Sequence, residues 1–499
     1  MLARYRAFGQ NAILRPRFRP EDSMRRTSVA ITLLLAALPL AAQQQQQGRP
    51  TLSENTRRFV SVDAPVVALT NVRVVDGTGA APAERQTIVI QGDKIAAVGP
   101  SSSVRAPQGA QVLDLAGHTV IPGIVGLHDH TFYTTSARSI QISTSAPRLY
   151  LANGVTTIRT TGSHSPYAEL NLKRAIDRGQ VPGPHMYVTG PYITGGTGAS
   201  GMASVLTPEE ARRLVAYWAE EGVSWLKFYM TIDRASMRAA IDEAHKRGVK
   251  ATGHLCSVSF REAVALGIDN LEHGLFVNTD YDPEKKPDQC PQGSMAKLAT
   301  LDLNSEPVRA TIREMTAKNV AMTSTLAVFE LFVPNRPPLE QRVLDAMAPD
   351  VRAEYLQSRA QLAQPGSFGL SPEVFKKAQQ FDVAFVRAGG LLAAGVDPTG
   401  NGGALPGYGD QRNYELLIEA GFTPVETVQI MTANGAKVLG GADTFGTIAA
   451  GKRADLVVVR GNPVATPGEI RNVVTVFKDG VGYDSAKLIE SVRGAVGVR

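Results

Sequence analysis

Short apolar segments that alternate with helical ones are the feature that most restricts how this chain can fold. Amphipathic stretches such as PEEARRLVAYWAEEG and DRASMRAAIDEAHKRG separate several of the apolar segments. Between residues 123 and 439, eight segments have the length and composition of buried strands: GIVGLHDH, VTTIRT, MYVTG, SWLKFYM, KATGHL, DNLEH, AMTSTLAV and LLAAGVD. Alternating strands and helices favour a parallel sheet covered by helices, and eight such units predict an α/β fold of the (β/α)8 TIM barrel type.

The segments on either side of this region have a different pattern. Residues 61–122 and 440–485 contain short β-rich runs separated by turns, such as QTIVIQGDKIAAVGP and ADLVVVRGNP. Each segment is too short to bury a good core alone. We therefore expect both chain ends to form one small β-sandwich domain beside a barrel of residues 123–439.

The first 42 residues have the pattern of an export signal. Arginines at 25 and 26 precede an apolar run, residues 29–40, which is too short to span a bilayer. Small residues at 41 and 42 offer a cleavage site. We expect translation to start at Met24, residues 43–60 to form a linker, and the mature protein to be periplasmic or secreted, with no membrane segment. A membrane anchor is the alternative.

Charge argues against nucleic acid as a partner. The formal net charge is +6, and residues 1–42 hold seven arginines against two acidic residues, which accounts for +5 of it. The rest of the chain has no basic run with interleaved aromatic residues. Cys256 and Cys290 are the only cysteines, too few for a disulfide framework or a closed zinc site. Whether they pair with each other is left open by the sequence.

Side chains that bind metals stand near the ends of several predicted strands. His128 and His130 share one face of GIVGLHDH, because side chains alternate along a strand. His254 follows in KATGHL, His273 ends DNLEH, and Asp397 ends LLAAGVD. Chemistry in TIM barrels occurs at the carboxyl ends of the strands, where neutral imidazoles and a carboxylate can bind metal ions.

Lys227 lies in a further strand, SWLKFYM, on one face with Trp225 and Tyr229. An isolated H-x-H pair is as compatible with two core histidines as with a metal site. Six such residues near the ends of five strands instead favour one shared centre. Cys256 follows His254 at strand spacing, so it either lines the pocket or is a small buried filler.

These segments, in this order, resemble the amidohydrolase superfamily. IPGIVGLHDH, NGVTTIR, SWLKFY, AHKRGVKATGHL, GIDNLEHG and GTIAAGKRADLVV are similar to its imidazolonepropionase-like branch, which includes Xaa-Pro dipeptidases. Two positions depart from the branch: Thr160 stands where aspartate is common, and Cys256 where histidine is common. Neither is a metal ligand in the family, so the departures concern the substrate rather than the metals.

The resemblance implies two divalent metal ions, with zinc expected. One ion would be held by His128, His130 and Asp397 and the other by His254 and His273, with a carboxylated Lys227 joining them. A metal-bridging hydroxide would attack the carbonyl, and Asp397 would move its proton to the leaving amine. Tyr229 would help to polarise the carbonyl oxygen. Arg412, in GDQRNYELL, is a candidate for binding a substrate carboxylate.

The expected function is that of an exported metal-dependent hydrolase that cleaves the C–N bond of dipeptides or N-acyl amino acids. Its partners would be small-molecule amides or peptides. The sequence leaves the number of subunits open, and a homo-oligomer is possible. A lactonase or cyclic-amide hydrolase on the same metal site is an alternative. A non-catalytic metal-binding scaffold is a further alternative, against which the complete set of ligands argues.

Overall fold

The structure is a computed structural model of the 499-residue chain. It describes residues 49–196, 201–364, 367 and 369–498. The predicted signal peptide and its cleavage site lie outside these residues. The described residues from 49 onwards form one compact unit. Across its described part, every helix is too short or too polar to cross a membrane.

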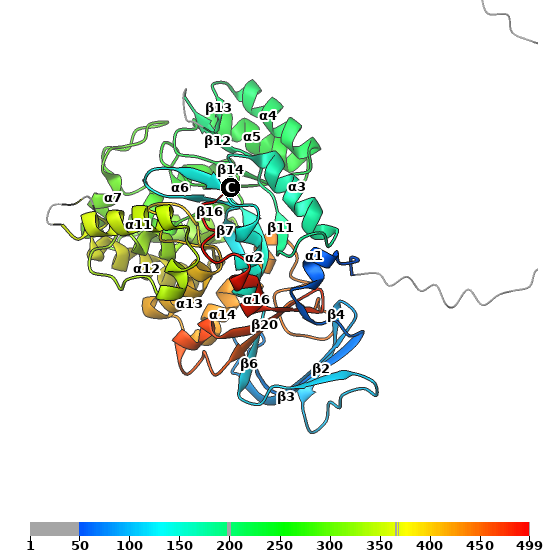
Figure 1. Cartoon of the computed structure of the whole chain (residues 1–499). Coiled ribbons are helices and arrows are strands. Elements are labelled where there is room, and N and C mark those ends of the chain that lie inside the picture. The colour runs from blue at the N-terminus through cyan, green and yellow to red at the C-terminus, as the bar shows by residue number, and fades with distance from the viewer. Residues whose placement is uncertain (1–48, 197–200, 365–366, 368, 499) are drawn as a thin grey trace, which may run out of the picture. The chain divides into compact units, whose positions relative to one another are not determined.

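Strands from both chain ends lie in one sheet of nine strands (lower part of Figure 1). The strand order is β1-β21-β20-β19-β6-β2-β3-β4, and β5 pairs with β2. The strands are β1 (Val60–Val62), β2 (Val66–Val74), β3 (Ala83–Gln91), β4 (Lys94–Pro100), β5 (Gln111–Asp114), β6 (His118–Pro122), β19 (Leu456–Arg460), β20 (Val473–Lys478) and β21 (Val481–Asp484).

The junction between the two ends of the chain is the antiparallel pair β6–β19, in which Thr119 lies opposite Val459. One buried cluster takes Val67 and Ile90 from the first end and Leu456 and Phe477 from the second. Hydrogen bonds and apolar packing therefore both connect the two ends.

The middle of the chain contains parallel strands in two sheets, ordered β11-β10-β7 and β13-β12-β14-β15-β16-β17-β18. A separate two-stranded sheet pairs β8 (Phe132–Thr134) with β9 (Ser139–Gln141). The parallel strands are β7 (Ile124–Asp129), β10 (Val155–Thr160), β11 (His185–Tyr187), β12 (Tyr192–Gly195), β13 (Ala203–Val205), β14 (Trp225–Phe228), β15 (Lys250–Gly253), β16 (Asn270–Glu272), β17 (Ala321–Ser324) and β18 (Leu392–Ala394).

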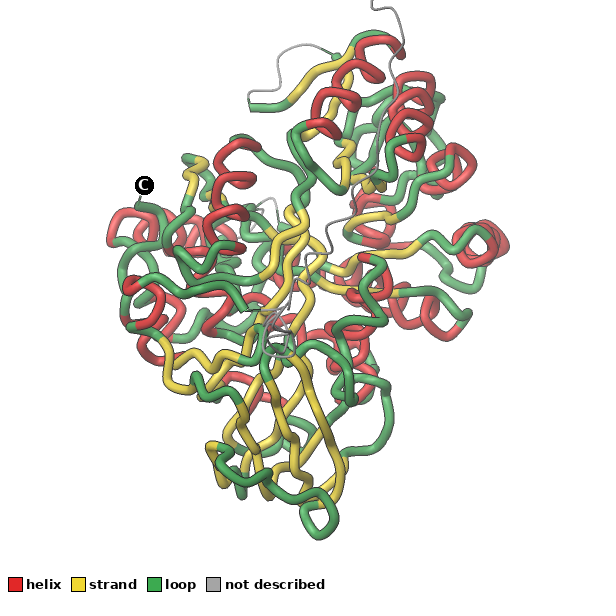
Figure 2. Tube along the Cα trace, turned by 90° about the vertical axis from the view of Figure 1, so that its right-hand side faces the viewer, coloured by secondary structure: helices red, strands yellow, loops and turns green. Residues whose placement is uncertain are grey.

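The strands sit at the centre with helices on their outer side, as Figure 2 shows. Each of the eight predicted segments contains one parallel strand, so the predicted α/β class is confirmed. Every residue of β7, β10, β14 and β17 is buried, as expected for strands covered on both faces. One boundary was wrong: AMTSTLAV leaves the strand conformation after Ser324 and enters a helix at Leu326.

Hydrogen bonds connect the two parallel sheets at both ends of the strand series. The backbone N–H of Asp397 donates to the carbonyl of His128 at 2.7 Å, which connects the segment after β18 to β7. A parallel bridge between Ser163 and Pro191 connects the segment after β10 to the start of β12. The two parallel sheets are therefore connected to each other on both sides.

Capping residues mark the ends of several helices. The Thr207 side chain accepts a hydrogen bond from the N–H of Glu210 at the start of α4, and Gly267 ends α6 with a φ of 93°. The helices are α1 (Glu54–Arg57), α2 (Ser145–Ala152), α3 (Pro166–Asp177), α4 (Pro208–Glu220), α5 (Arg234–Lys246), α6 (Phe260–Leu266), α7 (Ser294–Lys297), α8 (Glu306–Ala317), α9 (Leu326–Glu330), α10 (Gln341–Leu344), α11 (Pro349–Leu362), α12 (Pro372–Arg387), α13 (Tyr408–Ala420), α14 (Pro424–Gln429), α15 (Gly435–Leu439) and α16 (Ser485–Glu490).

Candidate metal centre

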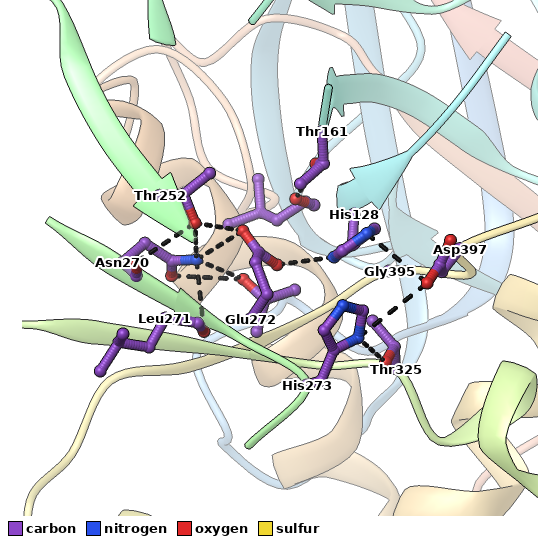
Figure 3. Close-up of polar contacts among 12 residues, drawn as sticks. His128, Thr161, Thr252, Asn270, Leu271, Glu272, His273, Thr325, Gly395 and Asp397 are labelled. Atoms are coloured by element: carbon purple, nitrogen blue, oxygen red, sulfur yellow. Dashed lines mark hydrogen bonds and ion pairs between the residues drawn. The ribbon is translucent and has the colours of Figure 1, made fainter. Parts of the chain in front are cut away.

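Three of the predicted ligands converge at the carboxyl ends of the parallel strands (Figure 3). One ligand atom each from His128, His273 and Asp397 lies within 4.8 Å of the others. The Asp397 Oδ2 atom is 3.6 Å from His128 Nε2 and 4.0 Å from His273 Nδ1. All three side chains are buried. Their geometry allows one small cation to be shared among them.

The other two predicted histidines flank this group. His130 Nε2 lies 3.4 Å from Asp397 Oδ1, and His130 Nδ1 lies 3.1 Å from the carbonyl oxygen of Gly162. The ring of His254 has its centroid 4.5 Å from that of His273. The four histidines and the aspartate therefore form one cluster, although they come from four separate segments of the chain.

Close packing of the backbone brings the first and last strands of the series together. Gly395, two residues before Asp397, lies against β7 so tightly that an added Cβ would be 2.2 Å from the backbone nitrogen of His128. Only glycine fits there without displacing the backbone. The space that Gly395 leaves is taken by the strand that carries His128.

Lys227 is buried, with 1% of its surface exposed. Its Nζ has no hydrogen-bond partner among the described residues. Burial lowers the pKa of this amine to about 8; Arg159 also lowers it, while Glu272 and Asp397 oppose the shift. An amine with this pKa is partly neutral near neutral pH, and a neutral amine is the form that reacts with carbon dioxide.

The electrostatics favour neutral imidazoles around an ionised carboxylate. Burial lowers the pKa of all four histidines, to about 3 for His254. Burial opposes ionisation of Asp397, but its contacts with His128, His130 and Thr399 hold its pKa below the usual range. Neutral imidazole nitrogens and a carboxylate oxygen are the donor set that zinc and similar divalent ions accept. The residues present therefore fit the predicted metal ions.

Glu272 is a functional candidate that the sequence did not reveal. Its Oε2 atom lies 2.8 Å from His128 Nδ1, and its Oε1 atom accepts hydrogen bonds from Thr252 and Asn270 (Figure 3). The same Oε1 atom also accepts a hydrogen bond from Arg159. The carboxylate fixes the proton of His128 on Nδ1 and leaves Nε2 facing Asp397.

Regular strand alternation would place the side chains of Glu272 and His273 on opposite faces. The chain departs from that pattern, because β16 ends at Glu272 and His273 has a φ of 65°. Both side chains can therefore approach the same cluster. The local sequence offers only a carboxylate beside a histidine, which is a weak signal without the backbone geometry.

We expect Glu272→Gln to weaken metal binding by about 10–100-fold, because an amide cannot hold the His128 Nδ1 proton as a carboxylate does. Stability should also fall, since Arg159 loses its buried partner. Metal affinity is measured by competition with a chromophoric chelator at a temperature where circular dichroism shows folded protein. The surface variant Glu314→Gln, which loses a pair with Arg261, is the control. Equal metal affinity in both variants would remove Glu272 from the centre.

Of the other predicted site residues, Tyr229 lies near the metal-binding cluster, whereas Arg412 is paired with glutamates. Tyr229 lies beside the cluster, with its ring centroid 4.9 Å from that of His254. Arg412 is occupied elsewhere: its guanidinium pairs with Glu330 at 2.7 Å and with Glu415 at 2.6 Å. It is therefore not free to bind a substrate carboxylate.

Cys256 is joined to Cys290 by a disulfide. The bond connects the segment after β15 to the long loop before α7. Because its sulfur is bonded to Cys290, Cys256 has no free thiol to offer to a substrate.

A second group of metal-type side chains, His185, Asp455 and Asp479, lies between β11 and the terminal sheet. Arg453 lies 2.5 Å from Asp455, and Lys478 lies 2.9 Å from Asp479. Both carboxylates thus already have cationic partners. This group connects the terminal sheet to the parallel strands rather than offering a place for a cation.

The fold and the cluster define a class of protein: a metal-dependent hydrolase on an α/β scaffold, with its ligands at the carboxyl ends of parallel strands. The model of the amidohydrolase family matches residues 119–281 and 410–482. The chain belongs to the amidohydrolase family.

Known proteins of similar sequence and structure agree with this assignment. N-substituted formamide deformylase from Arthrobacter pascens is 40% identical over 62 residues, which is 12% of this chain and spans only 11% of that enzyme. A candidate prolidase from Bifidobacterium longum has 26% identity and a TM-score of 0.61, over 86% of this chain and 98% of that one. A Xaa-Pro dipeptidase with bound methionine has 19% identity and a TM-score of 0.63, over 84% of this chain and 100% of that one, a likeness of fold.

Proposed function

We propose that this enzyme hydrolyses the C–N bond of dipeptides or N-acyl amino acids with two divalent metal ions bound. The observation that carries the proposal is the buried Nζ of Lys227, which has no hydrogen-bond partner in the described residues and interacts electrostatically with the four histidines and Asp397. A lysine in that position has no structural partner in the described residues, whereas a carbamate on it would bind metal ions. The names of the similar proteins, a prolidase candidate and a Xaa-Pro dipeptidase, support this substrate class.

The proposed assignment of ligands is the one that the resemblance to the superfamily implies, and it divides the group of His128, His273 and Asp397 between two ions. His128, His130 and Asp397 would hold one ion, His254 and His273 the other, and carboxylated Lys227 would join them. Bound metal ions would supply Lewis-acid polarisation of the carbonyl and a lowered pKa for the attacking water. Zinc is the proposed metal, because neutral imidazoles dominate the donor set.

Asp397 would transfer a proton during the reaction, and Tyr229 would donate a hydrogen bond. Asp397 is ionised, so it would accept the proton of the attacking water and pass it to the nitrogen as the C–N bond breaks. Burial and the charge of Asp397 raise the pKa of Tyr229, so its hydroxyl stays protonated and would donate to the carbonyl oxygen. Glu272 would keep His128 in the required tautomer.

The experiment is a substrate screen of metal-loaded protein against Xaa-Pro dipeptides, other dipeptides, N-acyl amino acids, lactones and cyclic imides. We expect the highest kcat/KM for dipeptides or N-acyl amino acids. Activity should disappear with a chelator and return with added zinc. Turnover confined to lactones or cyclic imides would favour the alternative function on the same site, and turnover indifferent to chelation would contradict the metal-dependent proposal.

We also propose that eight of the ten parallel strands, one from each predicted segment, form one barrel, a proposal supported by the links between the two parallel sheets. The terminal sheet of residues 61–122 and 440–485 would be a separate small domain beside it.

Export is proposed as well, and the disulfide between Cys256 and Cys290 supports it, since such bonds persist in oxidising compartments. The mature chain should begin near Gln43. N-terminal sequencing of protein from the cell envelope tests this, and an intact Met1 or Met24 would contradict it.

A further inference from the structure

A cavity of about 210 Å³ lies outside the metal centre. It is lined by residues of α9, α10, α11 and α13, by the loop before α10 and by Gly403 and Ala404. None of the predicted metal ligands lines it. This is well above the volume that a single water molecule needs, so the cavity can hold a small organic molecule.

The strand segment before α13 separates this cavity from the cluster. Val396 packs against α13, where an added Cβ on Gly409 would be 2.0 Å from its Cγ2 atom. The next residue, Asp397, faces the histidines instead. Gly409 lines the cavity, so the cavity and the metal centre lie on opposite sides of this segment.

Apolar side chains, four arginines and two glutamates, Glu330 and Glu340, line the cavity. Leu331 and Val343 are buried apolar residues of its wall, and Ala404 is another. The arginines are Arg342, Arg359, Arg412 and Arg471. A cavity that is apolar on one part and rich in guanidinium groups on another suits a molecule with an apolar body and an acidic end.

Three of these arginines have carboxylate partners. Arg412 makes two hydrogen bonds to Glu330, at 2.8 and 2.7 Å. Arg471 pairs with Glu340 at 3.0 Å and with Glu415 at 2.6 Å, and Arg342 pairs with Glu340 at 2.7 Å. The three arginines therefore share three glutamates.

Arg359 is the exception. Its guanidinium donates to the carbonyl oxygens of Arg336 and Pro337. No carboxylate of the described residues lies within 4.0 Å of it. Arg336 is itself balanced by Glu330 and Glu419. The group of five arginines and four glutamates thus carries one positive charge without a carboxylate, and that charge belongs to Arg359.

We propose that this cavity binds a small monocarboxylic acid with a short apolar body, its carboxylate on Arg359 and its apolar part against Leu331, Val343 and Ala404. One negative charge matches the one unbalanced guanidinium. The cavity has room for a short branched acid. The site is independent of the metal chemistry proposed above.

The test is isothermal titration of the metal-loaded enzyme with isovalerate and with isovaleramide, which has the same shape without the charge. We expect saturable binding of isovalerate, and binding about tenfold weaker or more for the amide, because a charge-assisted hydrogen bond is lost. Arg359→Gln should weaken isovalerate binding to the same extent. Arg352→Gln, on the same helix but paired with Asp345 outside the cavity, should leave it unchanged.

A second variant, Leu339→Trp, narrows the cavity and keeps every charge, so it should also weaken isovalerate binding. It provides the test if Arg359→Gln fails to fold. Carboxylates also bind to metal ions, so the titration is repeated after the metals are removed. Binding by the metal-free enzyme that depends on Arg359 supports the proposal. Binding that is lost with the metals and is insensitive to Arg359→Gln overturns it, as does the absence of saturable binding. These outcomes do not depend on which substrate the enzyme cleaves.

Discussion

Lys227→Ala is expected to lose at least half of the bound metal and nearly all of the activity. The native amine is buried without a hydrogen-bond partner in the described residues, and a cation at that position would repel two metal ions. The proposed carbamate reverses the sign of this charge and gives both ions a shared ligand. Removing the side chain removes that ligand, so the second ion should dissociate first.

The measurements are metal per chain by atomic emission and kcat/KM, with and without added acetate or propionate. A short carboxylic acid should restore part of both by occupying the space of the missing side chain. Lys250→Ala is the control, because this lysine lies one strand away near Trp225 and donates to the carbonyl of Val438. A Lys227→Ala enzyme with two metals and full turnover would eliminate the binuclear proposal.

Asp397→Asn is expected to retain the fold and lose activity by a factor of about 10²–10⁴, the range for loss of a general acid–base group. The amide has nearly the same shape as the carboxylate, but it cannot accept a proton and is a poorer metal ligand. The effect should appear in kcat at saturating substrate as well as in kcat/KM, since the proton transfer belongs to the chemical step.

A buried aspartate outside the cluster gives a matched control. Asp382 on α12 lies 2.6 Å from Ser324 Oγ, and burial raises its pKa to about 7, so it is already partly protonated. Asp382→Asn should change kcat little, because the amide can replace a protonated carboxyl group in this contact. Near-normal turnover of Asp397→Asn at unchanged metal content would remove Asp397 from the mechanism.

Strand alternation was sufficient to predict much of the cluster. His128 and His130 were predicted from a spacing of two, and the ends of the apolar segments located His254, His273 and Asp397. This worked because the carboxyl ends of parallel strands meet at one edge, whatever the residues between them.

Backbone geometry and long-range pairing limited the rest of the prediction. Glu272 was missed because His273 has a positive φ, which brings two consecutive side chains to the same place. Arg412 was considered a candidate for binding substrate because the sequence around it does not indicate its main partner. That partner, Glu330, lies 82 residues away in the sequence. No local pattern indicates that a charge is already balanced by so distant a residue.

The strand order of the terminal sheet determines when the sheet can be completed during synthesis of the chain. β6 is paired on one side with β2, but its other side must wait for β19, more than 300 residues further along the chain. The β2–β3–β4 meander can form while the chain is still emerging, since its contacts are local. A chain that ends before Leu456 would leave β6 with an open, apolar edge, which is a template for aggregation. The last strands to be synthesised therefore complete the sheet that the first strands begin, and a truncated chain keeps an exposed strand edge.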